Sequence, residues 1–414
     1  MAIVIHNLRP APNTHISAVH RHFFAANLSS GMPRRFNVRA NLLPFPEKSS
    51  KYYKHLEAAV EVVQRASHLC VDVKSSLFST DDKVLEKNDN TPVTVADFGV
   101  QALLSLELNK LFPDIPLVAE EDSAFLRSRN LAGTVLDAVT AKASSTGKPL
   151  TQDDVLEAID RGGKDASVFG SKPATYWVLD PIDGTRGFLK ASKSLYVVGL
   201  ALVVEGEVVI GVMGCPNWQE DLSEKSPADM KEHTDSLSGS GIVMIAHIGC
   251  GTWTKRLNNT SKLPDAWTRC FVDGFDLVHK ARFCIPDSQT WESLPLSSLY
   301  NATSDADNVG SNQILILTAC CGSLCKYLMV ASGRASIFMQ RKKEKTTIKS
   351  WDHAVGMLCV HEAGGKVSDW EGSEIDLAAD ESERRVIFPS GGVLVTNGTL
   401  HHNILHIISQ TSTL

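Results

Sequence analysis

The sequence predicts a fold in which α-helices and β-strands pack in layers. Apolar residues recur at helical spacing in two segments, 56–73 and 100–111. Short apolar runs and a hairpin follow, and the remaining half of the chain mixes both patterns. Because a helix buries one stripe and a sheet buries a face, such elements have to cover one another in layers.

The elements are expected in the following order. The first helix has its apolar positions at Leu56, Ala59, Val60, Val63, Ala66, Leu69 and Val73, and the second at Val100, Leu103, Leu104, Leu108 and Leu111. Pro113 ends the second helix. The apolar run 195–204 turns at Glu205-Gly206 into a second run, which predicts a hairpin. This run is too short to span a bilayer, so we expect no membrane partner. Residues 131–172, with a helix start at Thr151, and 222–238 are expected insertions.

Composition limits the possible functions. A chain of 414 residues with 43% hydrophobic content is long enough for several domain-sized units, and we expect domains over 51–216 and 217–414. The formal net charge of -6 argues against a protein that binds nucleic-acid polymers through a basic face. Nine cysteines without a CxxC pair or a secretory signal indicate a reducing compartment. We interpret the cluster formed by Cys320, Cys321 and Cys325 as apolar core residues rather than as a redox switch.

The first fifty residues differ from the rest. Glu47 is their only acid, whereas arginines stand at positions 9, 21, 34, 35 and 39. A basic segment that lacks a continuous apolar stretch is typical of an organellar transit peptide. We expect residues 1–50 to be a disordered leader for the mitochondrion. The chloroplast is the alternative organelle, and a disordered cytosolic tail is the alternative interpretation.

The strongest functional signal is the segment 177–185, an apolar run that leads into two carboxylates. Asp180 and Asp183 flank a proline, which fixes its own φ and keeps the preceding residue extended. Two carboxylates on one stiff turn suit a hard divalent cation. The Asp-Gly turn that follows lets backbone N–H groups approach an anion. The combination indicates metal-assisted phosphate hydrolysis, although such a motif alone more often marks only a turn.

Three further acids stand at the ends of expected elements. Glu120 follows the apolar run 117–119, Asp97 lies at the start of the second helix, and Asp352 precedes an apolar helical stretch. Asp97 and Asp352 could each be a helix cap, a common role for aspartate. Four separated acidic sites at element ends are nevertheless hard to explain as solvated surface.

Four segments carry a resemblance to a known family: TPVTVADFGVQALL (91–104), LVAEED (117–122), WVLDPIDGTRGFLK (177–190) and WDHAVGMLCVHEAGG (351–365). The chain resembles the magnesium-dependent, lithium-sensitive phosphatases of the inositol monophosphatase superfamily. Among them it is most similar to the plant and fungal 3'(2'),5'-bisphosphate nucleotidases. The resemblance covers about residues 51 to 405. It implies an αβαβα sandwich.

The resemblance also implies a site for two to three magnesium ions. Glu120, Asp180 and the backbone carbonyl of Ile182 would hold one ion. Asp180 would bridge to a second ion, which Asp183 and Asp352 also hold. Two such ions can bind both the attacking and the leaving oxygen of an in-line displacement.

The implied catalytic pair is Thr185 with a carboxylate. Thr185 would accept a hydrogen bond from the attacking water and pass proton density toward Glu120 or Asp97, because a hydroxyl alone is no base. Asp97 would also orient a third, looser ion or its water. The amides of Gly184 and Thr185 would hold the phosphate. Five neighbours are expected to take no part in the chemistry: solvated Glu121 and Asp122, structural His353, and the packing residues Trp177 and Trp351.

The implied substrate pocket departs from the family pattern. Ser323 and Lys326 match a Ser-x-x-Lys pair that contacts the nucleotide, and Asp352 would also touch the substrate. The family's phosphate-binding arginine falls on Gln340. A one-residue bulge could bring Arg341 into its place, with an exposed loop as the alternative. The family's adenine-contacting histidine has no clear counterpart in 284–295.

The expected function is removal of the 3'-phosphate from adenosine 3',5'-bisphosphate, a by-product of sulfotransfer, to give AMP. The partner would then be a small phosphorylated nucleotide. Two alternatives stay open at this point. One is an inositol monophosphate or polyphosphate as substrate, and the other is a non-catalytic nucleotide-binding sensor. The sequence leaves the oligomeric state undetermined.

Overall fold

The computed structural model describes residues 43–77, 85–86, 92–144, 148–172, 174–189, 194–219, 241–257, 266–286, 294, 315–319, 322–343 and 347–411. Most of the predicted transit peptide and the insertion expected at 222–238 lie outside these residues, as does most of 284–295.

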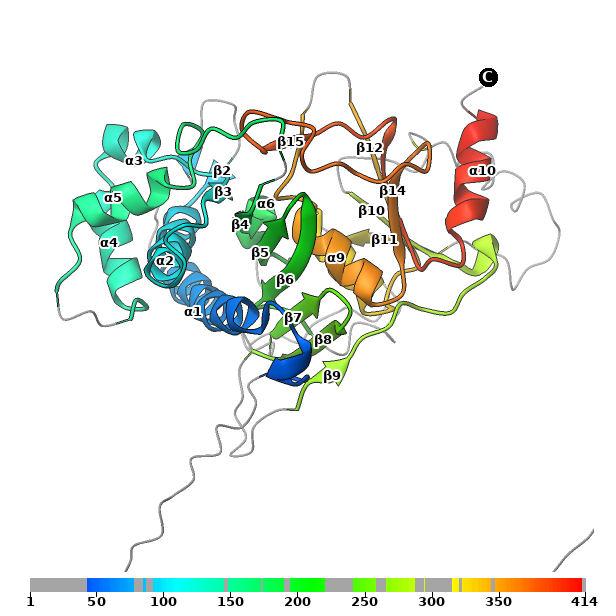
Figure 1. Ribbon diagram of the computed structural model, residues 1–414, viewed down its shortest axis with the longest axis horizontal. Helices are drawn as coiled ribbons and strands as arrows, with labels where there is room; N and C mark the ends of the chain where they lie inside the picture. The colour runs from blue at the N-terminus through cyan, green and yellow to red at the C-terminus, as the bar shows by residue number, and fades with distance from the viewer. Residues whose placement is uncertain are drawn as a thin grey trace, which may run out of the picture. The chain divides into compact units, whose positions relative to one another are not determined.

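Two long helices form the first layer (Figure 1). α1 (Tyr53–Leu77) and α2 (Val95–Leu111) pack against each other, and the apolar positions that predicted them are largely buried. α2 begins earlier than the apolar spacing indicates because a capping box starts it. The Thr94 hydroxyl accepts the Ala96 N–H, and the Asp97 carboxylate accepts the Thr94 N–H.

Three short helices cover the outer side of α2. They are α3 (Ala124–Arg129), α4 (Ala132–Thr140) and α5 (Gln152–Asp160). Their apolar side chains form one core with α2, which includes Phe98, Leu126, Val135 and Ile159. Thr151 caps α5, as the sequence predicts, and the segment 131–172 is therefore structured around two helices.

A seven-stranded sheet forms the second layer, in the order β3-β4-β5-β6-β7-β8-β9. β3 pairs with β4 in parallel, and the other pairs are antiparallel. The predicted hairpin is confirmed, with Glu205 and Gly206 at positive φ in its turn. The strands are β3 (Leu117–Ala119), β4 (Tyr176–Asp183), β5 (Val197–Val204), β6 (Glu207–Cys215), β7 (Ile242–His247), β8 (Gly251–Arg256) and β9 (Thr268–Arg269).

Alternate residues of this sheet belong to different cores. On β4, Trp177 and Leu179 join the core with α1 and α2, whereas Tyr176 and Val178 join the core on the opposite face. That opposite face is covered by α8 (Leu324–Ala331) and α9 (Ala354–Glu362). The site residues at the end of β4 are therefore positioned between a sheet and a helical layer.

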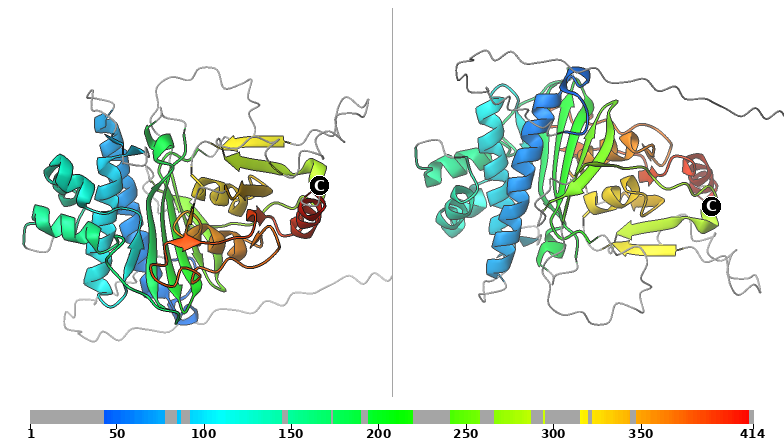
Figure 2. Two further views of the ribbon diagram at one scale, coloured as in Figure 1. Left: turned by 90° about the horizontal axis from the view of Figure 1, so that it is seen from above. Right: turned by 90° about the horizontal axis from the view of Figure 1, so that it is seen from below.

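A second sheet and a last helix complete the fold. The sheet has the order β11-β10-β12-β16-β14 and packs on α8 and α9, while α10 (His401–Thr411) covers its outer face. Its strands are β10 (Arg282–Pro286), β11 (Leu315–Ala319), β12 (Ile337–Arg341), β14 (Lys366–Asp369) and β16 (Gly392–Thr396). Figure 2 shows the layers in the order helix, sheet, helix, sheet, helix. The αβαβα architecture is confirmed.

The remaining described elements are short. β1 (Leu85–Glu86) pairs with β2 (Pro92–Val93), and β13 (Ile348–Lys349) pairs with β15 (Val386–Ile387). α6 (Thr185–Leu189) follows β4 directly. The two short 3-10 helices are η1 (Glu47–Ser49) and η4 (Val278–Lys280).

Two features bear on the expected domain boundaries. The boundary expected after residue 216 lies between β6 and β7, which are neighbouring strands of one sheet, and residues 41–414 form one compact unit. At the other end, Leu43 and Phe45 are only 2% and 8% exposed and belong to the core with α1. Residues 43–50 are therefore part of the folded unit, although the sequence assigned them to the leader.

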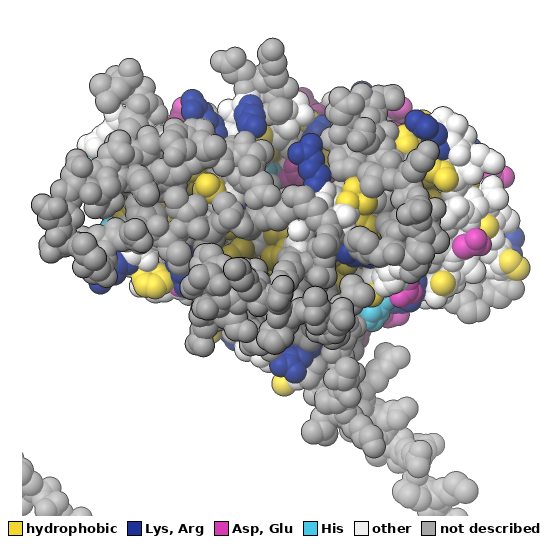
Figure 3. Space-filling view, turned by 180° about the vertical axis from the view of Figure 1, so that it is seen from behind, with side chains coloured by type: hydrophobic (Ala, Val, Ile, Leu, Met, Phe, Trp, Pro, Cys, Tyr) yellow, Lys and Arg dark blue, Asp and Glu magenta, His cyan; other side chains and the backbone are white. Residues whose placement is uncertain are grey.

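The described surface carries both signs of charge. On the face seen from behind in Figure 3, the visible Lys and Arg side chains are interspersed with Asp and Glu. None of the helices in the described ranges is long and apolar enough to cross a membrane.

Candidate active site

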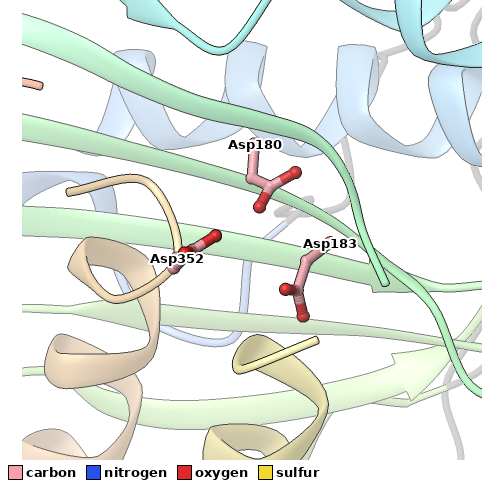
Figure 4. Close-up of side chains that lie close together, drawn as sticks. All are labelled: Asp180, Asp183 and Asp352. Carbon is pink, nitrogen blue, oxygen red and sulfur yellow. The ribbon is translucent and has the colours of Figure 1, made fainter. Parts of the chain in front are cut away.

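The centre of the site is a group of three aspartates. Asp180 and Asp183 at the end of β4, and Asp352 just before α9, offer carboxylate oxygens that all lie within 4.8 Å of one another. Figure 4 shows the three side chains close together, with the carboxyl group of Asp183 turned toward the start of α8. Residues of β4 and α9 are far apart in sequence, so this grouping depends on the packing of α9 on the sheet.

A break in strand pairing places the two β4 aspartates on one face. Side chains of a regular strand alternate, so residues three apart would point to opposite faces. The β4–β5 register shifts between Asp180 and Asp183, around Pro181, which has no N–H to donate. Asp180 and Asp183 can therefore both turn toward the layer of α8 and α9.

The N-terminal end of α8 holds Asp183. Its carboxylate accepts the Ser323 N–H at 2.9 Å and the Leu324 N–H at 2.7 Å. Gly322 makes this approach possible: its φ is +73°, and a Cβ there would overlap the Asp183 carboxylate. The sequence motifs do not reveal these contacts, because the contacting groups are backbone amides.

The site favours a bound cation. Burial raises the pKa of Asp180 and of Asp352 well above the usual range, and the negative charges of neighbouring carboxylates raise both further. Burial also raises the pKa of Asp183 to about 6, although the charge of Lys326 opposes this shift. Asp180 Oδ1 is buried and has no hydrogen-bond partner among the described residues. Clustered carboxylate oxygens, one of them unpaired, are a donor set that fits a hard divalent ion.

Glu120 lies beside this group. It directly follows β3, and its charge raises the pKa of both Asp180 and Asp352. Its carboxylate is not among the three within 4.8 Å of one another. The neighbouring Glu121 is only 3% exposed, so the prediction that it is solvated is wrong, whereas Asp122 is exposed as predicted.

Buried Gln101 fixes the backbone on the C-terminal side of β3. Its amide nitrogen donates to the carbonyl oxygen of Glu121, and its amide oxygen accepts the Glu121 N–H.

Thr185 and Asp97 lie in contact. The Thr185 hydroxyl lies 3.3 Å from Asp97 Oδ1 and 3.1 Å from the carbonyl oxygen of Ile182. The other oxygen of Asp97 accepts the N–H and the hydroxyl of Thr94, each at 2.7 Å. Asp97 is thus both the partner in a helix cap and a neighbour of Thr185.

Gly184, at φ 87°, turns the chain from β4 into α6. This turn brings Thr185 back toward Ile182 and toward the start of α2.

The expected substrate residues divide into two groups. The Ser323 hydroxyl donates to the side-chain oxygen of Gln340 at 3.2 Å, while Lys326 is 1% exposed and its ammonium donates to the carbonyl of Gly322. Arg341 is exposed at the end of β12.

The pairing of β12 with β16 continues without a shift through Gln340 and Arg341. The bulge that would place Arg341 beside Ser323 is therefore absent from this described pairing. By strand alternation, Gln340 shares the face of Phe338 toward α8, and Arg341 shares the opposite face with Met339.

The residues expected to be structural are buried. His353 is completely buried, and its Nδ1 lies 2.9 Å from the hydroxyl of Tyr327. Burial lowers the pKa of His353 to about 3, so it is neutral at physiological pH. Trp177 and Trp351 are 1% and 4% exposed and pack in the cores. Cys325 is buried, in agreement with an apolar role, while Cys320 and Cys321, the other members of the predicted cysteine cluster, lie outside the described residues.

Fold and site together define a class: a five-layered α/β protein with an acidic cation site at the end of β4, the strand next to the edge of the seven-stranded sheet. The model of the "Inositol monophosphatase family" matches residues 52–413, and the chain belongs to that family. It is 62% identical to a "Putative 3'(2'),5'-bisphosphate nucleotidase, mitochondrial" of Arabidopsis thaliana, over 92% of each chain. It is 36% identical to a "3',5'-bisphosphate nucleotidase AHL" of the same plant, over 82% of this chain and 93% of the relative.

Solved structures agree with the fold. An IMPase of Thermotoga maritima superposes with a TM-score of 0.53 at 18% identity and covers 87% of this chain and 98% of its own. The extragenic suppressor protein suhB of Bartonella henselae superposes with a TM-score of 0.54 at 18% identity. The match covers 86% of this chain and 99% of the suhB chain. At this identity the likeness concerns the fold alone.

Proposed function

We propose that the protein is a magnesium-dependent phosphomonoesterase that converts adenosine 3',5'-bisphosphate and water to AMP and phosphate. The observation that carries the proposal is the group formed by Asp180, Asp183 and Asp352, with Glu120 and the Thr185–Asp97 pair beside it. The names of the relatives support the nucleotide as substrate. A non-catalytic sensor is the weaker hypothesis, because it would not require this complete set.

Metal ligands are assigned as follows. Glu120, Asp180 and the carbonyl of Ile182 would hold one Mg²⁺, and Asp180, Asp183 and Asp352 a second. Bound ions would lower the pKa of a water molecule and offset negative charge on the departing oxygen. Hydrogen bonds to backbone amides keep the Asp183 carboxylate in a fixed orientation before any ion binds.

Thr185 and Asp97 would handle the proton. Asp97 Oδ1 can accept the Thr185 hydroxyl proton, which leaves the threonine oxygen to accept a proton from water. Asp97 Oδ2 is already engaged by Thr94, so the carboxylate keeps a fixed orientation toward Thr185. The amides of Gly184 and Thr185 stand at the start of α6 next to the acids, where a phosphate oxygen could bind. A third ion or its water would lie near Asp97.

The substrate assignment has one specific rival. Ser323 and Gln340 are neighbours at the α8 side of the site, and their hydrogen bond is between neutral groups. A neutral pair offers less attraction to a second phosphate than an arginine would, which favours a substrate with one phosphate, such as an inositol monophosphate. The ammonium group of Lys326 donates to the carbonyl oxygen of Gly322.

Phosphate release tests the proposal directly. Protein from residue 41 onward would be assayed with Mg²⁺ on adenosine 3',5'-bisphosphate, inositol 1-phosphate and inositol 1,4-bisphosphate. We expect the nucleotide to be preferred, and Asp183→Asn to abolish turnover while the protein stays folded. Preference for an inositol phosphate would change the substrate and keep the mechanism. No release from any of the three would support the sensor.

The cellular assignments are part of the proposal. The relative at 62% identity carries "mitochondrial" in its name, and the basic leader agrees with this organelle. A fluorescent fusion of residues 1–50 that stays in the cytosol would contradict import, and chloroplast fluorescence would select the other organelle. We further propose that lithium inhibits the enzyme by occupying a magnesium site, and that the enzyme clears a by-product of sulfur metabolism. Its partners would be small molecules rather than nucleic-acid polymers or membranes.

A further inference from the structure

One arginine outside the motifs contacts several segments that build the acidic site. The guanidinium of Arg385 donates through Nη2 to the carbonyl oxygen of Glu120 at 3.2 Å and through Nη1 to the carbonyl oxygen of Gly162 at 3.2 Å. Its central carbon lies 4.7 Å from the ring centre of Trp351, the residue before Asp352. One side chain therefore touches both the Glu120 segment and the Asp352 segment.

The main chain of Arg385 anchors the second of these segments. Its carbonyl oxygen accepts the Ser350 N–H at 2.9 Å, and its own N–H donates to the carboxylate of Asp380 at 2.9 Å. Ser350 stands two positions before Asp352, at the end of the β13–β15 pairing. The backbone holds the Asp352 side of the site while the guanidinium reaches across to the Glu120 side.

The carbonyl of Gly162 reinforces the other side. It accepts both Arg385 Nη1 and the N–H of Ala119, the last residue of β3, at 2.9 Å. The guanidinium and Gly162 together fix the point where β3 ends and Glu120 begins. Burial lowers the pKa of the Arg385 guanidinium, while the negative charges of Glu383, Glu120 and Asp122 act in the opposite direction.

We propose that Arg385 is a positioning residue, which holds Glu120 at a set distance from Asp352 and so determines how tightly the site binds divalent ions. The inference rests on the proposed metal site. The role requires a planar group with two hydrogen-bond donors and a flat face that stacks on an indole ring. The lysine ammonium has neither this pair of fixed donors nor a flat face. Substitution of residues that orient metal ligands without touching the metal commonly changes metal affinity about 10- to 100-fold.

The test is Mn²⁺ binding to the full chain, followed by the electron paramagnetic resonance signal of free Mn²⁺ during titration. We expect Arg385→Gln and Arg385→Lys each to weaken binding about tenfold or more. Lysine keeps the positive charge, so weaker Mn²⁺ binding by Arg385→Lys would show that the geometry of the guanidinium matters rather than its charge. The Lys variant also keeps the test usable if the Gln variant does not fold.

Arg282→Lys is the matched control. Arg282 also stacks on an aromatic ring, that of Phe275 at 5.1 Å, donates to the carbonyl of Gly333 and forms an ion pair with Asp273 at 3.2 Å. Among the described residues it contacts neither the Glu120 segment nor the Asp352 segment. We expect this variant to lose thermal stability and to bind Mn²⁺ like the wild type. Wild-type affinity in either Arg385 variant, or an equal loss in Arg282→Lys, would overturn the inference.

Because binding is measured without turnover, the inference and the proposed function fail separately. Weakened Mn²⁺ binding in a protein that releases no phosphate would leave the positioning role intact and reject the enzyme. No Mn²⁺ binding by the wild type would overturn both the metal site and the role of Arg385.

Discussion

Asp183→Asn should make the ion-free protein more stable at neutral pH. The folded protein raises the pKa of Asp183 from 3.8 to about 6, mainly through burial. A raised carboxyl pKa means that the folded state holds the proton more tightly, so ionisation of Asp183 destabilises the fold. The destabilisation grows as pH rises from about 4 to 6 and is constant above. It amounts to about 3 kcal/mol at pH 7 and to about half of that at pH 5.

The asparagine also has a cost. Asp183 accepts two backbone N–H groups with two carboxylate oxygens, and an asparagine can accept only one of them. The second N–H then faces an amide NH₂, which costs about 1–2 kcal/mol. We therefore expect the unfolding free energy in EDTA to rise by about 1–2 kcal/mol at pH 7 and to be nearly unchanged at pH 5.

Denaturant unfolding in EDTA and in saturating Mg²⁺, at both pH values, measures these differences. Magnesium at a hundred times its dissociation constant should stabilise the wild type by about 2.7 kcal/mol and the variant much less. Asp137→Asn, a change of an exposed acid on α4, is the control and should have no effect in either buffer. A variant less stable than the wild type in EDTA at pH 7 would refute the electrostatic reasoning, and equal stabilisation by Mg²⁺ would refute the ligand assignment.

Three further outcomes are expected. Thr185→Val removes the hydroxyl that contacts Asp97; kcat should fall about 10²- to 10⁴-fold with little change in melting temperature, and a KM effect alone would contradict the proton role. Gln340→Arg places a cation beside Ser323. It should raise kcat/KM for adenosine 3',5'-bisphosphate relative to kcat/KM for 3'-AMP. An equal ratio in the variant and the wild type would show that this position does not contact the second phosphate. Deletion of residues 1–50 removes Leu43 and Phe45 from the core. The free energy of unfolding, measured by chemical denaturation, should be several kcal/mol lower than after deletion of residues 1–40. Equal stabilities would place the start of the folded unit after residue 50.

Much of the fold could be predicted because its signals are local. The helical spacing in α1 and the hairpin of β5 and β6 arise from neighbouring residues, and both are confirmed. The acidic motifs are also local, and three of their carboxylates converge in the structure. Glu121 shows the limit of this reasoning: its sequence environment looks solvated, yet it is only 3% exposed, and buried Gln101 holds its backbone.

The substrate side could not be predicted in the same way. Whether Gln340 or Arg341 turns toward Ser323 depends on the pairing register of β12 with β16, since a one-residue slip exchanges the two faces. No local pattern marks that register. Arg385 likewise has no motif of its own, and its importance follows only from the carbonyl groups and the indole ring around it.

The sequence by itself determined the layered class, the family resemblance and the residue types of a cation site, because periodicity and motif spacing are properties of short segments. Tertiary structure decided which groups meet. A register shift turns Asp180 and Asp183 to one face, the packing of α9 adds Asp352, and the loop after β3 brings Glu120 to their side. Such contacts join residues distant in the chain, so they are fixed only when strand pairing and helix packing are complete.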